Sequence, residues 1–374
     1  MIGLFSFFAG AGFLDLGFEM TSHFKTLFVN EFKPSFNYIY QYSREKIGIE
    51  KPRFGHHVGD IHTWLSGEQN KELHEYLTLS KDDPTIDMVG FIGGPPCPDF
   101  SVAGRNRGKE GDNGKLSQTY VDLICDMIPD FFIFENVKGL YRTAKHREFF
   151  ESLKTQLKDA GYYLTEQLIN AIEFGAPQDR DRIILIGFHK KTHNKLHFKI
   201  EDFQIKDFDW DKNKLYSRDV LNLDWPHVSP YNENTPTPMP DGIIEQLSIM
   251  YWWKKNDVEN HPNANMYFKP RAGLYRFQTK DEGDDLKKCY KRLHRWRYSP
   301  TAAYGNNEVH IHPFKPRRIS VSEALAIQSL PKEYEIPLDV TLSDAFKTIG
   351  NGVPYLAAKG IALNIFDFIV SHTK

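Results

Sequence analysis

Short apolar segments alternate with longer segments of helical period along the first half of the chain. The apolar segments cover residues 2–8, 25–30, 86–92 and 130–135, and the helical segments cover 116–127 and 146–160. Such alternation predicts β-strands that are each followed by an α-helix and packed into a mostly parallel sheet. Two further apolar segments are close enough in sequence to extend the sheet as a hairpin, at 162–169 and 183–188. We therefore expect an α/β fold.

The pattern changes after residue 189. Residues 190–316 are rich in Trp, Tyr, Asn, Pro and Lys, show little periodicity, and include the turn-rich segment SPYNENTPTPMPDG. Helical period returns from Arg317 onward. We therefore expect two domains: a discontinuous first domain, 1–189 plus 317–374, and a smaller, loop-rich second domain, 190–316, called the module below.

Composition narrows the class of protein. The chain has 374 residues, of which 40% are hydrophobic and 26% charged, an ordinary balance for a globular protein. We find no run of the roughly 20 apolar residues that a membrane span needs, and the N-terminus lacks a basic region and a cleavage site. We therefore expect a soluble, intracellular protein. The three cysteines are too few for a disulfide framework, and no Cys/His spacing predicts a metal site.

Charge is distributed unevenly between the two predicted domains. The net charge is −2, yet residues 190–316 carry 21 Lys and Arg against 17 Asp and Glu, a net charge of +4. The densest cations of the module alternate with aromatic residues, which suits a phosphate backbone, although a solvated helix face would look the same. These cations are Lys287, Lys288, Lys291, Arg292, Arg295 and Arg297.

A glycine-containing segment, FFAGAGFLDLGF, follows the first predicted strand. Gly10 and Gly12 allow a tight turn and a close approach of the backbone to a ligand, although an ordinary strand-to-helix turn also uses such glycines. Two acids favour the ligand: Glu31 ends the second apolar segment, and Asp60 follows a third candidate strand. Acids at successive strand ends suit the ribose diol and the adenine amino group of a nucleoside cofactor.

A nicotinamide cofactor is the obvious alternative, because its glycine turn and ribose acid occupy equivalent places. Its third glycine commonly lies three residues after the second, where this chain has Asp15, and Gly17 comes two residues later. The spacing therefore favours a cofactor that carries adenosine without a pyrophosphate.

Cys97 follows two prolines in the segment GGPPCPDFS. Pro95 and Pro96 fix two φ angles and supply no N–H groups, so the chain leaves the strand on a stiff course and presents Cys97 at the carboxyl edge of the sheet. A free cysteine is more often an inert core residue, but Asp99 and Ser101 beside it are polar. The glycine-rich segment that follows predicts a mobile basic loop over the site, or else a plain surface loop. Its cations are Arg105, Arg107, Lys109 and Lys115.

Two later strand-like segments carry polar groups at their ends. Burial at the end of FFIFENV would raise the pKa of Glu135 and make it a proton donor, unless the segment only supplies Asn136 as a helix cap. In QDRDR, alternation places Gln178, Arg180 and Arg182 on one face, where they could hold a polar substrate. A salt-bridge ladder on an edge strand is the alternative.

Taken in order, these segments resemble the motifs of the C5-cytosine DNA methyltransferases. Eight segments are similar to that family's motifs: FAGAGFLDLGFE, NEF, GDI, GGPPCPDFS, ENV, QDRDR, RRISVSEALAIQSLP and GNGVP. The resemblance covers most of residues 1–189 and 317–374. It implies the Rossmann-like fold of S-adenosylmethionine-dependent methyltransferases, with a target-recognition domain at 190–316.

The resemblance also implies a role for each site residue. Cys97 is the implied nucleophile toward C6 of cytosine, and Glu135 the partner of N3. Arg180 and Arg182 are implied to bind the base and the phosphate near the reacting ring. The implied cofactor is S-adenosylmethionine. The residues implied to bind it are Phe8, Gly10, Gly12, Glu31, Phe32, Asp60, Ile61, Pro96, Asn351 and Val353.

The implied substrate is a cytosine flipped out of duplex DNA at a specific sequence. The implied partner is a cognate restriction endonuclease that shares this sequence without a stable complex. We expect a monomer in the cytoplasm of a prokaryote, associated with the nucleoid and not with a membrane. The residues expected to contact DNA are Ser101, Arg105, Arg107, Lys287, Lys288, Lys291, Arg292, Arg295, Arg297 and Thr301.

Three departures from the family pattern stand out. Phe13 replaces a glycine of the first motif, Pro98 follows the cysteine where many members have glutamine, and the chain starts almost at the first strand, which indicates a compact prokaryotic-type enzyme.

A tRNA cytosine methyltransferase is an alternative with similar motifs. A catalytically silent DNA-binding relative is another, although the chain keeps the implied nucleophile, the acid and both arginines. A nicotinamide oxidoreductase is the most distant alternative.

Overall fold

The computed structural model describes residues 1–96, 112–141, 143–270, 274–304 and 308–373. Nine strands of these residues form one sheet, in the order β3-β2-β1-β4-β5-β7-β6-β9-β8. Their bounds are β1 (Ile2–Phe7), β2 (Phe24–Glu31), β3 (His56–Val58), β4 (Met88–Gly93), β5 (Phe131–Val137), β6 (Tyr162–Asn170), β7 (Asp181–His189), β8 (Ile200–Glu201) and β9 (Gln204–Ile205).

The five strands from β3 to β5 pair in parallel, whereas β7 pairs antiparallel with both β5 and β6. The mostly parallel sheet and the hairpin of β6 and β7 confirm the fold predicted from the apolar pattern. Because the carboxyl ends of parallel strands lie at one edge, the ends of β1, β2, β3, β4 and β5 are brought together there.

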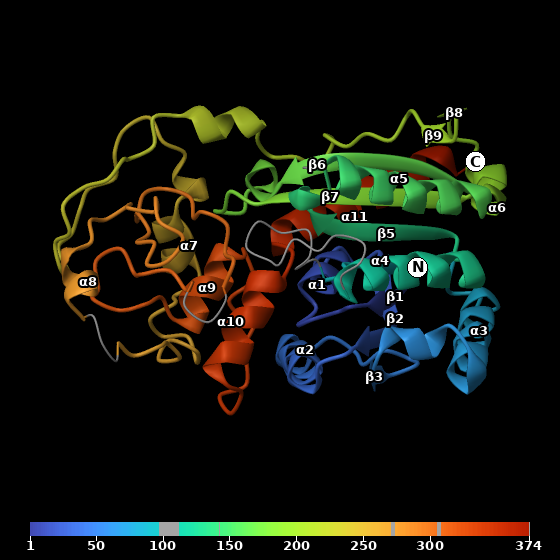
Figure 1. Ribbon diagram of the computed structural model, residues 1–374, viewed down its shortest axis with the longest axis horizontal. Helices are drawn as coiled ribbons and strands as arrows, with labels where there is room; N and C mark the ends of the chain where they lie inside the picture. Colours follow the sequence, from blue (N-terminus) through green and yellow to red (C-terminus); the bar gives the residue numbers. More distant parts are fainter. Residues whose placement is uncertain (97–111, 142, 271–273, 305–307, 374) are drawn as a thin grey trace.

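Helices cover both faces of the sheet (Figure 1). One face carries α3 (Gly67–Lys81), α4 (Asp112–Met127) and α5 (Ala144–Asp159), whose apolar residues share a core with Phe5 and Phe7 of β1. The other face carries α1 (Phe13–Glu19), α6 (Lys190–Leu196) and α11 (Tyr355–His372), which share a core with Ile2 and Leu4. Successive β1 side chains alternate between these two cores, as a strand buried on both sides requires. Each large apolar side chain buried in this way contributes about 1.5–3 kcal/mol.

The C-terminal helices contribute to the interior of the fold. By length and apolar composition alone, the helical stretch Leu342–His372 could cross a membrane, but 67% of its most apolar window is buried inside the protein. This burial is that of a core helix, since α11 packs on α1 and on the sheet.

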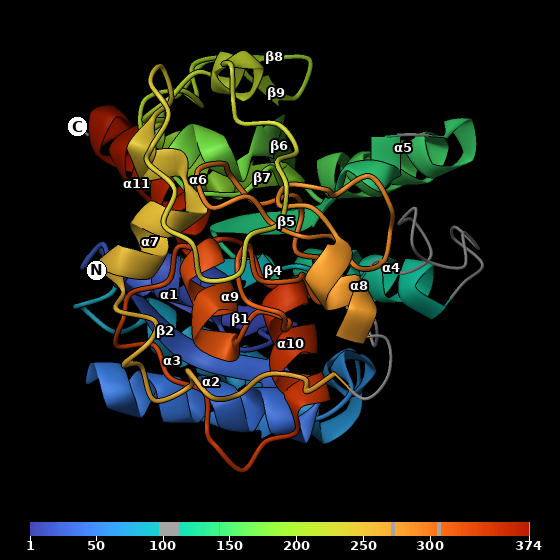
Figure 2. The same cartoon turned by 90° about the vertical axis from the view of Figure 1, so that its left-hand side faces the viewer.

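The module consists mainly of loops with short helices in its described residues. These include α7 (Ile249–Lys255) and α8 (Leu274–Thr279), which lie on the side of the molecule that also carries α9 (Val321–Ile327) and α10 (Leu342–Asn351) (Figure 2). The helix α7 packs on α9, and α10 contacts α2 (Pro34–Ile47). Trp252, Trp253 and Leu293 of the module share one apolar core with Ile319 and Ala324. The bounds predicted for the two domains stay a prediction. The apolar core is continuous between the two predicted domains, and β8 and β9, which fall within 190–316, belong to the sheet of the first domain.

Candidate active site

The turn after β1 has the backbone conformation that its glycines suggested. Gly10 and Gly12 have φ of 57° and 75°, and Phe8 also has a positive φ, 53°. The left-handed region is costly for most residues and open to glycine. The Gly10 N–H donates to Glu31 Oε2 at 2.7 Å, so the turn and the acid at the end of β2 are in direct contact.

The neighbouring strand ends supply two acids and an exposed aromatic ring. Burial raises the pKa of Glu31, although the N–H groups of Lys33 and Gly10 oppose this. Phe32 is 71% exposed, so its ring is free to stack on a ligand. The backbone N–H of His62 lowers the pKa of Asp60, which therefore stays ionised near neutrality. An acid for a diol, an open ring and a second acid fit an adenosine moiety at this edge of the sheet.

The C-terminal segment GNGVP packs behind the start of α1. Phe13 is buried and stacks edge-on against Tyr334, with ring centroids 5.2 Å apart. A Cβ at Gly352 would lie 2.2 Å from the Phe13 ring, so this glycine allows the two segments to touch. The departure at position 13 is therefore accommodated by a close packing contact. Of the two residues predicted at the cofactor from this segment, Val353 is buried and Asn351 is exposed.

The segment that leads to Cys97 passes next to Glu135. A Cβ at Gly94 would lie 2.5 Å from Glu135 Oε2, and Pro96 is exposed. Two residues, Pro95 and Pro96, separate Gly94 from Cys97, which itself lies outside the described residues. The predicted DNA contacts Ser101, Arg105 and Arg107 lie outside them as well. Of the predicted basic loop, residues 112–115 belong to α4.

Glu135 forms a buried ion pair with Arg182. Because β5 and β7 are antiparallel, Arg182 enters opposite Val137, and its Nε lies 2.6 Å from Glu135 Oε1. Both side chains are 10% exposed. Burial raises the pKa of Glu135, and the charges of Arg182 and Arg180 lower it in part. A carboxyl group in this environment can retain a proton at a higher pH than usual and pass it to a partner.

The alternation predicted for QDRDR is present, but its three side chains on one face have different partners. Gln178, Arg180 and Arg182 are buried. Arg180 donates to the main-chain oxygens of Ala302 at 3.1 Å and Gly350 at 2.7 Å. The Gln178 side chain accepts from the Ala302 N–H at 3.0 Å. Gln178 and Arg180 therefore tie β7 to the module and to the C-terminal segment, and Arg182 is the member of the three that faces Glu135.

The predicted basic surface of the module divides into exposed and buried cations. Lys287 and Lys288 are exposed, and Lys291 and Arg297 are half-buried. Lys288 lies 3.1 Å from Glu308, and Arg297 lies 3.8 Å from Asp285. Thr301 is exposed and donates its hydroxyl to the main-chain oxygen of Asp179 at 2.6 Å.

Arg292 and Arg295 do not fit the predicted contact with phosphates. Arg292 is fully buried and donates to main-chain oxygens, among them that of His312 at 2.5 Å. Arg295 is 4% exposed and forms an ion pair with Glu282 at 2.8 Å. Both guanidinium groups are turned into the module, because their donors satisfy buried carbonyls and a buried carboxylate that water cannot reach.

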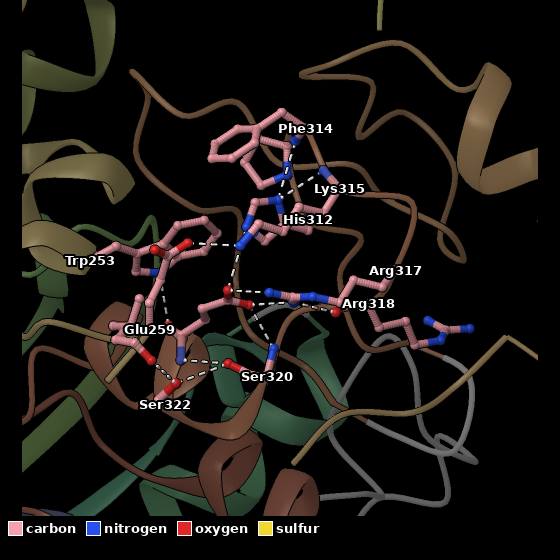
Figure 3. Close-up of polar contacts among 12 residues, drawn as sticks. Trp253, Glu259, His312, Phe314, Lys315, Arg317, Arg318, Ser320 and Ser322 are labelled. Atoms are coloured by element: carbon pink, nitrogen blue, oxygen red, sulfur yellow. Dashed lines mark hydrogen bonds and ion pairs between the residues drawn. The ribbon is translucent and has the colours of Figure 1, made fainter. Parts of the chain in front are cut away.

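The junction between the module and α9 contains a polar network that sequence analysis missed. Figure 3 shows His312, Arg317 and Ser320 of this network, and all three contact the carboxylate of Glu323. Arg317 donates to both of its oxygens at 2.7 and 2.8 Å, and the Ser320 N–H donates at 2.7 Å. Burial lowers the pKa of His312 to about 4. Burial alone would raise the pKa of Glu323, but His312 and Arg317 hold this pKa well below its usual range. The sequence signal that could have located this network was the Ser-x-x-Glu pattern of a capping box, which marks the start of a helix.

The cleft beside this junction has a volume of about 600 Å³ and is open to solvent. It is lined by Tyr267, Lys269, Leu274, Lys315 and Arg317, among others. Lys315 and Arg317 are paired with Glu259 and Glu323, and Lys269 is exposed.

Comparison with known proteins gives a consistent result over the whole chain. A family model described as C-5 cytosine-specific DNA methylase matches residues 2–367. The chain is 58% identical over 369 residues to the Type II methyltransferase M.NmeDI of Neisseria meningitidis serogroup C, covering 99% of this chain and 84% of the relative. It is 27% identical to the Type II methyltransferase M.FnuDI of Fusobacterium nucleatum, covering 97% of this chain and 95% of the relative.

Solved structures show the same fold. A putative DNA modification methyltransferase encoded within an Escherichia coli prophage superposes with a TM-score of 0.65 at 22% identity, covering 99% of this chain and 100% of the other. Spodoptera frugiperda DNMT2 superposes with a TM-score of 0.58 at 14% identity, covering 98% and 100%.

Proposed function

This chain belongs to the C-5 cytosine-specific DNA methylase family, and we propose that it methylates C5 of a flipped-out cytosine in a specific duplex DNA sequence through a covalent bond between Cys97 and C6. The coarser function is that of a DNA cytosine-5 methyltransferase of the type found in type II restriction-modification systems. The observation that carries the finer proposal is the buried Glu135–Arg182 pair, which lies beside the segment leading to Cys97.

The chemical problem is that C5 of cytosine is a weak nucleophile. Addition of the Cys97 thiolate to C6 forms an S–C6 bond and turns the ring into an enamine whose C5 can attack an electrophile, which is covalent catalysis. A free thiol has a pKa of about 8.5, so the nucleophile needs a lowered pKa. The arginines of the site are the cations that would lower it.

Glu135 stabilises the charge that develops on the ring during this addition. Addition at C6 pushes electron density toward N3, and a carboxyl group whose pKa is raised by burial can donate a proton to N3. Arg182 fixes the carboxyl group from one side through the ion pair at 2.6 Å. After methylation, loss of the C5 proton to a base breaks the S–C6 bond and releases 5-methylcytosine and the thiol.

S-adenosylmethionine, when bound, supplies an electrophilic methyl group. Its pocket lies at the ends of β1, β2 and β3, where Glu31 would hold the ribose diol, Phe32 would stack on the adenine, and Asp60 would accept from the adenine amino group. The glycine turn lines the other side. Other residues proposed at this pocket are Phe8, Gly10, Gly12, Ile61, Pro96, Asn351 and Val353.

DNA binding is assigned to the module and to the segment after Cys97. Flipping the target base costs a few kcal/mol, which contacts to the phosphate backbone must offset. The exposed Lys287 and Lys288 of the module, with Lys291 and Arg297, are placed to supply such contacts. Ser101, Arg105 and Arg107 are proposed to act near the flipped base, and Thr301 at the junction. The protein acts as a monomer in the cytoplasm, close to the nucleoid, and a cognate restriction endonuclease shares its target sequence.

One assay tests the proposed reaction and its substrate together. Purified protein is incubated with labelled S-adenosylmethionine and either plasmid DNA or tRNA, and 5-methylcytosine is mapped by bisulfite sequencing. We expect label in DNA at one recurrent sequence. Label in tRNA alone would assign the chain to RNA modification, and DNA binding without any label would identify a catalytically silent relative.

A further inference from the structure

A buried ion pair beneath the glycine turn has no role in the mechanism above. Arg44, on α2, lies 3.1 Å from Glu19 at the end of α1, and their side chains are 5% and 8% exposed. Removing two charges from water to this depth is costly unless both groups find further partners. The other partners of Arg44 therefore indicate what the pair does.

Arg44 donates to two main-chain carbonyls of the turn. Its Nη1 lies 3.3 Å from the oxygen of Ala11, and its Nη2 lies 2.5 Å from the oxygen of Gly12. A Cβ at Gly12 would lie 2.4 Å from the Tyr40 ring and 2.7 Å from Nη2. The Arg44 guanidinium also lies over that ring, 4.0 Å from its centroid. Gly12 is thus seated directly on the arginine and the tyrosine of α2.

The opposite side of the same turn is attached to the predicted ribose acid. The Gly10 N–H donates to Glu31 Oε2, and the Lys33 N–H donates to Oε1 at 2.8 Å. The turn therefore bridges Arg44 and Glu31: the arginine sets the position of residues 11 and 12, and residue 10 sets the orientation of the carboxylate.

The role of Arg44 is to place the turn, because the carbonyl oxygens of the turn also have other hydrogen-bond donors. The Ala11 oxygen also accepts from the Tyr334 hydroxyl at 2.8 Å, and the Gly12 oxygen also accepts from the Leu16 N–H at 2.9 Å. Loss of Arg44 would leave both oxygens with a partner. It would remove the planar fork that fixes their separation, which a lysine ammonium cannot reproduce.

We propose that Arg44 is a positioning residue of the cofactor pocket, holding the Ala11–Gly12 turn so that Gly10 keeps Glu31 oriented toward the ribose diol. This inference rests on the proposed use of S-adenosylmethionine.

The test is the dissociation constant of S-adenosylhomocysteine, measured by calorimetry on the full-length protein without DNA. Arg44→Lys keeps the charge and loses the fork, and we expect about tenfold weaker binding, the equivalent of one charge-assisted hydrogen bond. In the methylation assay the same variant should raise KM for S-adenosylmethionine and leave kcat nearly unchanged.

Arg295→Lys is the matched control. Arg295 is also a buried arginine paired with a carboxylate, with side chains 4% and 5% exposed, but it lies in the module. Thermal unfolding of both variants shows the stability that each has lost. We expect both to lose stability and only Arg44→Lys to lose cofactor affinity. Tyr334→Phe removes a second donor to Ala11, and about threefold weaker binding is expected from it.

The outcomes separate this inference from the proposed function. If the wild-type protein does not bind S-adenosylhomocysteine, the assigned cofactor is wrong and the role of Arg44 falls with it. If the wild-type protein binds and Arg44→Lys binds equally well, or no worse than Arg295→Lys, the positioning role alone is overturned. Should Arg44→Lys fail to fold, Tyr334→Phe decides, and an unchanged dissociation constant contradicts the role.

Discussion

Replacing Glu135 by Gln is the change that most sharply separates chemistry from stability in this site. Gln has the shape of Glu and can still donate a hydrogen bond to N3, but it cannot transfer a proton. In the folded protein Glu135 is 8% exposed, and Arg182 Nε lies 2.6 Å from its oxygen. The substitution therefore removes the proton donor of the protonated carboxyl group and, in the ionised state, the negative charge that balances Arg182.

The two losses have different magnitudes and appear in different measurements. Loss of a positioned proton donor slows a reaction by about 10²- to 10⁴-fold, which at about 1.4 kcal/mol per tenfold is roughly 3–6 kcal/mol in the barrier. Loss of one partner of a buried ion pair destabilises a protein by about 3–5 kcal/mol. Arg182 keeps a hydrogen bond to the main-chain oxygen of Asp181 at 2.8 Å, so the cost in stability should lie toward the lower end.

The assay is single-turnover methyl transfer at saturating DNA and S-adenosylmethionine, over a pH range that begins at the ordinary carboxyl pKa of 4.5, with urea unfolding measured in parallel. Because burial raises the pKa of Glu135, the wild-type rate should fall relative to that of the Gln variant as the pH rises through that raised pKa, since ionisation of the Cys97 thiol affects both proteins alike. The Gln variant should be slow and lack this fall.

The control for this experiment is Glu173→Gln. Glu173 is a buried acid outside the site, 2.9 Å from Lys214, and its side chain is 7% exposed. It should lose stability and transfer methyl groups at the wild-type rate. If Glu135→Gln transfers within about threefold of the wild-type rate while losing stability as the control does, proton donation by Glu135 is refuted, since that role requires about 10²-fold or more.

Three further predictions follow from other residues. Cys97→Ser should abolish methyl transfer and leave the dissociation constant of S-adenosylhomocysteine unchanged, as calorimetry would reveal; residual transfer at the wild-type rate would exclude this nucleophile. Burial raises the pKa of Asp15 from 3.8 to about 7, so the folded carboxyl group keeps its proton longer than the unfolded one. The stability that this proton confers is complete below pH 3.8 and is lost as the pH rises through about 7. Asp15→Asn should not show this loss, which is on the order of 4 kcal/mol between pH 4 and pH 8 at about 1.4 kcal/mol per pKa unit. Urea unfolding of both proteins at the two pH values measures it. If the Asp15 carboxyl group were ionised throughout, the difference in free energy of unfolding between wild type and variant would be the same at both pH values. Lys287→Ala and Lys288→Ala should each weaken DNA binding and reduce the slope of log K against log salt by about 1, and an unchanged slope would remove the residue from the phosphate interface.

The arrangement of strands could be predicted because it depends on local pattern and general rules of connection. Runs of apolar residues gave the positions of the central strands, and the contact between Gly10 and Glu31 follows from two neighbouring strands that end at one edge. The antiparallel pairing of β6 and β7 followed from their short separation in sequence.

The destinations of the buried arginines could not be predicted, because they depend on segments distant in sequence. Arg180 ends on carbonyls more than a hundred residues away, and Arg44 lies beneath a turn that precedes it by about thirty. In the module, Arg292 and Arg295 share their basic and aromatic surroundings with exposed Lys287. Local composition cannot separate a cation that binds phosphate from one that satisfies buried oxygens, since both need the same donors.

The most direct test of the account is covalent trapping on DNA that carries 5-fluorocytosine at the mapped target. Fluorine at C5 cannot leave as a proton does, so the S–C6 bond should persist after methyl transfer. We predict a complex that survives denaturation and, after proteolysis, a peptide linked through Cys97. Absence of the complex in an active preparation, or a complex that still forms with Cys97→Ser, would contradict it.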